Sequence, residues 1–141
     1  MSDCKAVPSP FQSGVKLIVY CNTPLVDATL YRQLVGSLIY LSHSRLDISF
    51  AFSMVSRFMQ KLHEIHWLEA KRILCYIQGT MHYGVFYLSK ANVSLLGYTD
   101  SDWAGDSFDR WLTVGYIFEL GSSPISWAPN KNLRALSLFI L

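Results

Sequence analysis

The sequence predicts an α+β chain in which three helices precede antiparallel strands. Apolar residues recur every three to four positions from about residue 29 to residue 78, which is the spacing of amphipathic helices. After Gly79 apolar and polar residues alternate instead, as they do in strands with two different faces. The chain has 141 residues, of which 51% are hydrophobic, so it can bury a core.

The composition excludes several classes of protein. With 14% aromatic residues the chain is not disordered. No apolar run reaches the roughly 18 residues of a membrane-spanning helix. The N-terminus lacks the basic start and apolar stretch of a signal peptide, so we expect neither export nor a membrane partner. Only 16% of residues are charged, which indicates a piece of something larger or an unusually apolar surface.

The three cysteines, Cys4, Cys21 and Cys75, are an odd number at wide spacings. This pattern predicts neither a disulfide framework nor a zinc ribbon. It favours a reducing, intracellular location, in the cytoplasm or the nucleus.

Residues 1–28 contain three prolines and little periodicity, which predicts a loop-rich leader with one short strand at 15–20.

Residues 29–82 predict a domain of three helices. Thr29 is expected to cap the first, which carries Tyr31 to Ile39 at helical spacing. Ser44 is expected to cap the second helix, whose apolar positions run from Ile48 to Met59. The negative charge of Asp47 is favourable near the N-terminus of this helix, which is the positive end of its dipole.

The third helix is predicted at about 65–78. Its apolar face carries Trp67, Ile73, Leu74 and Ile77, Glu69 and Arg72 are spaced to pair, and Gly79 is expected to stop it. Residues 83–141 predict a β meander, with strands at 83–88, 94–100, 114–120 and 124–128.

The net charge differs between the helical and the strand-rich parts of the sequence. Residues 1–90 hold nine Lys and Arg against five Asp and Glu, a balance of +4, and residues 91–141 hold three against five, a balance of −2.

Several motifs match one family in order. They are YRQLVGSLIYL at 31–41, RLDI at 45–48, VSRFM at 55–59, HW at 66–67, AKRIL at 70–74, YIQGT at 76–80 and GYTDSDWAGD at 97–106. The series resembles Ty1/copia-type retrotransposon Pol polyproteins, from the segment after the polymerase active site through the connection region to the opening strand of ribonuclease H. This resemblance spans roughly residues 4–137.

The resemblance implies a three-helix connection unit followed by the first three antiparallel strands of an incomplete ribonuclease H-like fold. Two departures indicate decay. Trp111 and Leu112 interrupt a motif that in the family reads Arg-Lys-Ser-Thr-Ser-Gly-Tyr, and Leu138 to Leu141 replace a continuation that in the family contains a catalytic glutamate. The incomplete sheet would leave an edge exposed, so we expect poor solubility and self-association through that edge.

By this resemblance Asp100 is the first-strand metal ligand and catalytic residue of the family, and Asp102 follows on the same face if the strand continues. The parent chemistry uses two Mg²⁺ ions held by carboxylates from several elements. Because the other ligands are missing or replaced, we interpret Asp100 and Asp102 as vestigial and expect no functional cofactor. The adjacent Asp pair of reverse transcriptases is absent from the sequence as well.

Two further groups of residues have more than one interpretation. Arg57, Lys61, Lys71 and Arg72 are a candidate nucleic-acid face, because the family's connection region lies near the template–primer duplex. An ordinary solvated face is the favoured alternative. His63 and His66 have a spacing that suits a metal ion, but no further ligand completes a set, so capping or packing is preferred.

The sequence therefore predicts a truncated, catalytically inactive remnant of the polymerase and ribonuclease H region. The alternative is a nonspecific binding protein for an RNA–DNA hybrid or for the parent polymerase. A secreted effector-like protein ranks last, because the sequence has neither an export signal nor an Arg-x-Leu-Arg motif.

Overall fold

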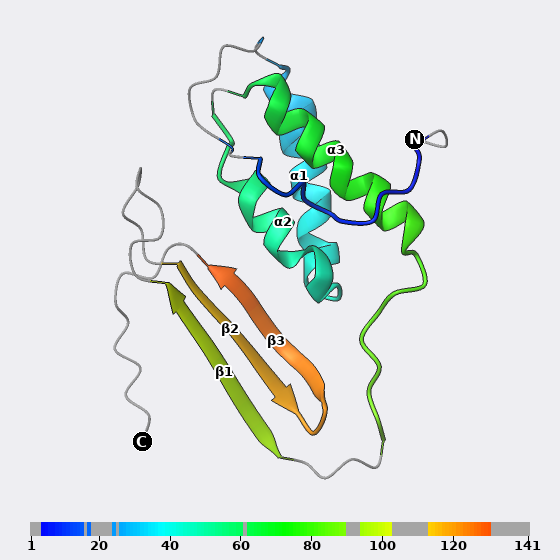
Figure 1. Ribbon diagram of the computed structural model, residues 1–141, viewed down its shortest axis with the longest axis vertical. Coiled ribbons are helices and arrows are strands. Elements are labelled where there is room, and N and C mark those ends of the chain that lie inside the picture. Colours follow the sequence, from blue (N-terminus) through cyan, green and yellow to red (C-terminus); the bar gives the residue numbers. More distant parts are fainter. Residues whose placement is uncertain are drawn as a thin grey trace. The chain divides into compact units, whose positions relative to one another are not determined.

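In a computed structural model, the described residues form three helices followed by a three-stranded antiparallel sheet, which confirms the α+β prediction (Figure 1). The structure describes residues 4–15, 17, 24, 26–60, 62–89, 94–102 and 113–130. The chain divides into two compact units, Met1–Gly84 and Val85–Leu141. We call them the helical unit and the strand unit.

The first helix, α1, spans Ala28–Ser42. Its N-cap is Asp27, whose Oδ1 accepts a hydrogen bond from the backbone N–H of Thr29 at 2.7 Å. The prediction that Thr29 is the cap is therefore wrong. Both residue types are good N-caps, but Asp27 lies two positions earlier and accepts from the free N–H of Thr29 itself, so the helix starts sooner.

The second helix, α2, spans Leu46–Ser56 and has no side-chain cap. Ser44, the predicted cap, instead donates its hydroxyl to the carbonyl of Leu41 at 3.3 Å, so it belongs to the end of α1. The helix also ends three residues before Met59. The backbone N–H of Phe58 bonds to the carbonyl of Val55 at 3.1 Å, a tighter turn that closes the helix.

The third helix, α3, spans Glu64–Gly79, close to the prediction. Gly79 is its last residue, but the reason for a glycine there is not a left-handed stop, because the positive φ values among the described glycines are at Gly14 and Gly121. A Cβ added at Gly79 would lie 2.7 Å from the Cβ of Ala6. Close approach of the N-terminal residues to α3 therefore requires the glycine.

One face of each helix builds the core of the helical unit. Its fully buried side chains include Tyr31, Val35, Leu38, Ile48, Ala51, Val55, Ala70 and Ile73. Trp67, Leu74 and Ile77 pack against this cluster, which confirms that the apolar stripe of α3 is core. Tyr31 is the polar exception, and its hydroxyl donates to the carbonyl of Val55 at 2.7 Å, which joins α1 to α2.

We expect Tyr31→Phe to lower the free energy of unfolding by about 1.5 kcal/mol, because a buried carbonyl loses its side-chain donor. Urea unfolding followed by circular dichroism at 222 nm measures this change. Tyr40→Phe, on an exposed residue of the same helix, is the matched control and should change little. An equal effect of both substitutions would contradict a special role for the Tyr31 hydroxyl.

Residues 4–15, which we call the N-terminal segment, contain no helix or strand but pack on the helices (Figure 1). Phe11 meets Phe50 of α2 edge to face at 5.9 Å between ring centroids. Cys4 forms a disulfide with Cys75 of α3, so the prediction that the cysteines form no disulfide is wrong. The strand predicted at 15–20 lies mostly outside the described residues, and positions 15 and 17 are not in a strand.

The strand unit contains β1 Leu95–Asp102, β2 Thr113–Leu120 and β3 Ser123–Asn130, in the order β1-β2-β3. Leu95 pairs with Leu120, and Ile117 pairs with Trp127. A register shift at Phe118 and Glu119 precedes the tight turn at Gly121, whose φ is 67°. These three strands confirm the predictions at 94–100, 114–120 and 124–128.

The predicted strand at 83–88 is wrong, because these residues have no regular structure. Two of them, Phe86 and Tyr87, are held to the first residues of β3 by side-chain hydrogen bonds instead of a ladder. The Ser123 hydroxyl donates to the carbonyl of Phe86 at 2.7 Å, and the Tyr87 hydroxyl donates to the carbonyl of Pro124 at 3.0 Å. A segment rich in aromatic and β-branched residues thus resembles a strand in sequence although it has no ladder partner in the described structure.

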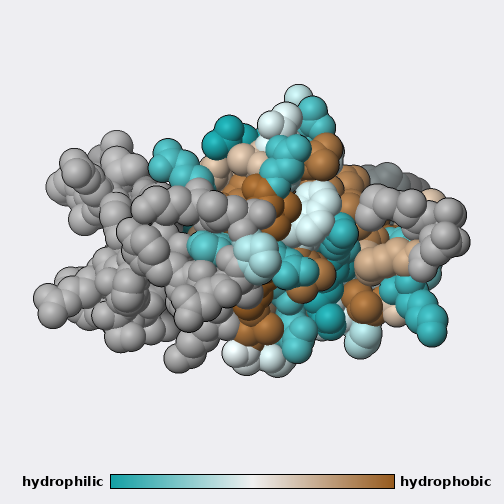
Figure 2. Space-filling view, turned by 90° about the horizontal axis from the view of Figure 1, so that it is seen from above, coloured by the Kyte–Doolittle hydropathy of each residue, from teal (hydrophilic) through white to brown (hydrophobic). Residues whose placement is uncertain are grey.

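Large apolar side chains remain exposed in both units, as the low charge content predicts. In the face that Figure 2 shows, hydrophobic patches interrupt the hydrophilic surface. The most exposed of these side chains are Tyr40 at 78%, Met81 at 78% and Phe86 at 79%. Among the described residues, the helices are too short or too polar to cross a membrane.

Candidate functional site

The most elaborate polar arrangement in the described residues surrounds Arg45, which is only 7% exposed. Its Nε and Nη2 donate to the two carboxylate oxygens of Asp47 at 2.8 and 2.7 Å. Its Nη1 donates to the carbonyl of Thr80 at 3.0 Å, and Nη2 also reaches the Thr80 hydroxyl at 2.7 Å. The guanidinium therefore joins the start of α2 to the end of α3.

Aromatic side chains complete the surroundings of Arg45. Its guanidinium carbon lies 6.0 Å from the ring centroid of Tyr76 and 5.8 Å from that of Tyr83. The Tyr76 hydroxyl donates to Asp47 Oδ2 at 2.9 Å. We call Arg45, Asp47, Tyr76 and Thr80 the Arg45 network. It occupies the C-terminal end of α3, where a cation is favoured by the helix dipole.

Electrostatics within the Arg45 network follow from these contacts. The hydrogen bond from Arg45 lowers the pKa of Asp47, although partial burial acts in the opposite direction. Burial, together with the hydrogen bond to Asp47, raises the pKa of Tyr76. The network therefore holds a charged pair and a neutral phenol at neutral pH. It has the features of a structural cluster and offers no nucleophile or open metal position.

We expect the helical unit to lose stability in acid because of Asp47. Its pKa is lower in the folded than in the unfolded chain, where a carboxyl titrates near about pH 4. The contribution of the Asp47 carboxylate to the free energy of unfolding is therefore complete above that pH. It disappears as the pH falls through the pKa of Asp47 in the folded chain. Asp47→Asn should flatten the dependence of urea midpoint on pH between about 5 and 2. Asp100→Asn, in the strand unit, is the control; a flattening by both would contradict this assignment.

The four candidate nucleic-acid residues have different surroundings. Arg57, at the end of α2, and Lys71 of α3 are exposed. Lys71 places its Nζ 4.9 Å from the ring centroid of Trp67. Arg72 donates from Nε and Nη2 to the carbonyl and hydroxyl of Ser9, at 3.1 and 3.2 Å. Lys61 lies outside the described residues, so this basic face stays a prediction.

The predicted pair of Glu69 and Arg72 is not formed. Glu69 is 5% exposed and accepts from the backbone N–H of Gln12 at 3.3 Å, while Arg72 binds Ser9. Both side chains are turned to the N-terminal segment, which the helical spacing alone does not reveal.

His63 and His66 have the capping and packing roles that the sequence favours. The backbone N–H of His63, at the N-cap of α3, donates to Nδ1 of His66 at 3.1 Å. His66 is fully buried and stacks on Phe58 with ring centroids 4.3 Å apart. Within the described part of the chain, no three His, Cys, Asp or Glu side chains are grouped so that they could hold a metal ion.

Asp100 lies in β1 opposite Gly115, with an exposed side chain. Strand β1 continues through Asp102, whose side chain is outside the description. The other described carboxylate of the sheet, Glu119, pairs with Leu96, four residues from Asp100. At a rise of about 3.3 Å per residue this separation is about 13 Å, much longer than the distance of about 4 Å between the ions of a two-metal site. The vestigial role of Asp100 and Asp102 stays a prediction.

Sequence reasoning missed the Arg45 network and the Cys4–Cys75 pair. Arg45 and Asp47 are two residues apart, which is not a helical pairing distance, and Thr80 is 35 residues away. The cysteines are separated by 71 residues. The available signal was weak in both cases: a buried arginine beside an acid, and two cysteines whose partners only the tertiary fold can choose.

Comparisons with known proteins give the chain a clear relationship. It is 45% identical over 131 residues, or 93% of its length, to the "Retrovirus-related Pol polyprotein from transposon RE1" of Arabidopsis thaliana. It is 42% identical over the same share to that from transposon RE2 of the same plant. It is also 37% identical over 102 residues, 72% of each chain, to the "Secreted RxLR effector protein 161" of Plasmopara viticola. No family model and no solved structure matches.

The chain is thus a transposon-derived protein whose sequence corresponds to a region of Pol. Its family is that of the Ty1/copia-type retrotransposon Pol polyproteins, as the motifs predict. The alignment spans 9% of the length of the RE1 and RE2 polyproteins.

Proposed function

We propose that the chain is a catalytically inactive remnant of the polymerase and ribonuclease H region of a copia-type Pol polyprotein. The observation that carries this proposal is that, among the described side chains, no second carboxylate converges on Asp100. It is exposed, and the nearest described carboxylate along the sheet is about 13 Å away by strand geometry. Hydrolysis with two Mg²⁺ ions needs several carboxylates that converge on one point.

Incubation of the full chain with Mg²⁺ and a labelled RNA–DNA hybrid tests this proposal. We expect no RNA cleavage above that of an Asp100→Asn variant. An active ribonuclease H in the same buffer controls for the substrate. Cleavage by the chain that Asp100→Asn abolishes would overturn the proposal, because it would require a complete set of metal ligands.

A second candidate function is sequence-nonspecific binding of an RNA–DNA hybrid or of the parent polymerase. It is favoured by the exposure of Arg57 and Lys71 in the helical unit, whose 84 residues hold eight Lys and Arg against five Asp and Glu. Binding through phosphate contacts should weaken steeply as salt rises from 50 to about 200 mM. The double substitution Arg57→Gln and Lys71→Gln should reduce both the affinity and its dependence on salt.

The remaining candidates have less support. Self-association through an edge of the sheet would raise the apparent mass in equilibrium sedimentation as concentration rises. The intracellular location stays a prediction. The similarity to the Plasmopara viticola protein covers less of the chain than the Pol similarity does, so an effector-like role remains the third candidate.

A further inference from the structure

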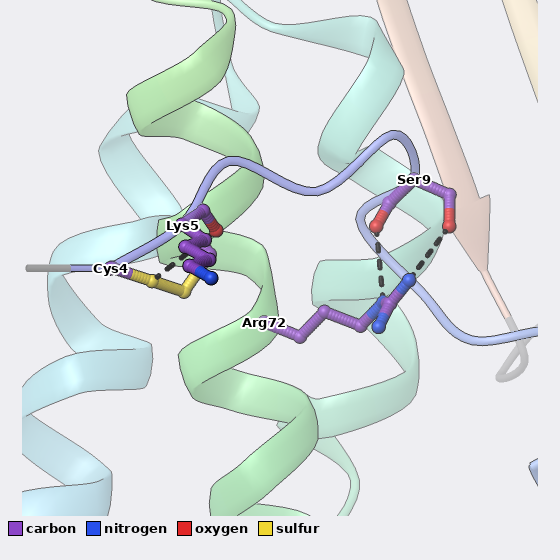
Figure 3. Close-up of a disulfide and its surroundings, with 5 residues drawn as sticks. Cys4, Lys5, Ser9 and Arg72 are labelled. Carbon is purple, nitrogen blue, oxygen red and sulfur yellow. Dashed lines mark hydrogen bonds between the residues drawn. A yellow bond between two sulfur atoms is a disulfide. The ribbon is translucent and has the colours of Figure 1, made fainter.

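A covalent bond anchors the N-terminal segment to α3. Figure 3 shows the disulfide between Cys4 and Cys75, with Ser9 bound to Arg72 further along the same helix. The segment passes Gly79 at Ala6 and reaches Glu69 at Gln12, so it runs along α3 in the opposite direction. It is thus fixed at its beginning by the disulfide and further along by polar contacts.

Apart from the packing of Val7 and Phe11 on the helices, the noncovalent contacts of the segment are few. Its described backbone-to-backbone hydrogen bonding consists of one bond, from Val15 to Gln12 at 3.4 Å. Two bonds from Arg72 and one to Glu69 join it to α3, and these are only partly buried. Pro8 and Pro10 have no N–H to donate. A segment with so few bonds opens locally at low cost unless a tether holds it.

The core of the helical unit is formed mainly by contacts among the three helices. Ile73 and Ala70 of α3 are fully buried against residues of α1 and α2. Cys4 and Cys75, in contrast, are only half-buried. A thiol reagent can therefore reach the disulfide without unfolding of the three helices.

We propose that the Cys4–Cys75 disulfide is a reversible redox latch that holds the N-terminal segment on α3. A dithiol reductant opens it by thiol–disulfide exchange: the S–S bond breaks, two S–H bonds form, and the reductant is oxidised to its own disulfide. The segment then leaves the helix, and Arg72 exchanges Ser9 for solvent. The inference goes beyond the proposed function and does not depend on it.

Hydrogen exchange with mass spectrometry on the full chain tests the latch. A disulfide-linked peptide containing Cys4 and Cys75 should be found in the oxidised protein. Reduction should speed exchange in the peptide of residues 5–12 by about 100-fold at Gln12, whose N–H donates to Glu69, and this factor lies in the range that loss of a second tether gives. Exchange in the interior of α3, at residues 70–77, should remain slower than exchange at Gln12 even though reduction lowers the global stability, and reoxidation with glutathione disulfide should restore protection.

Two variants make the result decisive. Cys4→Ser removes the latch from outside the core and should show fast exchange at residues 5–12 with and without reductant. Cys21→Ser leaves the Cys4–Cys75 pair and should respond to reductant as the parent does. Absence of the linked peptide, equal protection of residues 5–12 in both redox states, or loss of α3 protection together with the segment would each overturn the proposal.

Discussion

Replacing Cys4 by Ser is expected to lower the free energy of unfolding of the helical unit by about 4 kcal/mol under oxidising conditions. The disulfide spans a sequence separation of 71 residues and encloses α1, α2 and most of α3. A cross-link over such a loop restricts the unfolded chain, and the chain-entropy relation gives this magnitude. Urea unfolding followed at 222 nm measures it, since the described helices all lie in this unit.

The control for this prediction is the same comparison in the presence of a reductant. In the presence of reductant, Cys4→Ser and the parent should unfold at the same urea concentration, and Cys21→Ser should match the parent under both conditions. A difference that persists in reductant would mean that the serine disturbs packing near α3. Global unfolding is distinct from the local release of the N-terminal segment, which exchange at residues 5–12 reports.

The sequence predicted the existence of the helices better than their ends. Spacing alone places Val35, Ile48 and Ile73 in one core, because burial depends on a period that any apolar side chain can supply. The start of a helix depends instead on which of several neighbouring polar residues binds the free amides. Asp27 does so before Thr29, and Ser44 turns back to α1.

Strand prediction failed where pairing was required. Residues 83–88 are rich in the aromatic and β-branched residues of true strands but have no ladder partner in the described structure. Side-chain hydrogen bonds hold Phe86 and Tyr87 instead. A period of two shows that a segment is able to pair, whereas the pairing itself depends on a neighbouring edge.

The motifs predicted the family, but not the tertiary contacts of the candidate site. Asp100 was expected in the first strand of the sheet and lies there, in β1. The partners of Arg72 and Glu69 were missed, since Ser9 and Gln12 are more than 50 residues away in sequence. Contacts between such distant residues arise only when the N-terminal segment has reached α3.

Arg45→Met is expected to lower the free energy of unfolding by about 3 kcal/mol. The side chain is buried and donates to Asp47 and Thr80. Its removal takes the arginine donor from the carbonyl and hydroxyl of Thr80 and leaves the Asp47 carboxylate with the Tyr76 hydroxyl as its side-chain donor. Methionine fills a similar volume, which limits the contribution of a cavity. The value lies at the lower end of the range for broken buried pairs, because Asp47 is 30% exposed and water partly replaces the arginine.

A double-mutant cycle with Asp47→Asn separates the ion pair from the other contacts of Arg45. Asp47→Asn alone leaves a buried cation without its counter-charge and should cost about 2 kcal/mol. If the two side chains act mainly on each other, the double variant should cost less than the sum of the single ones by about 1 to 2 kcal/mol. Strict additivity would show that Arg45 stabilises the fold through the end of α3 at Thr80, independently of Asp47. In that case Thr80→Val should reproduce a large part of the Arg45→Met effect, because it removes the hydroxyl that the guanidinium contacts.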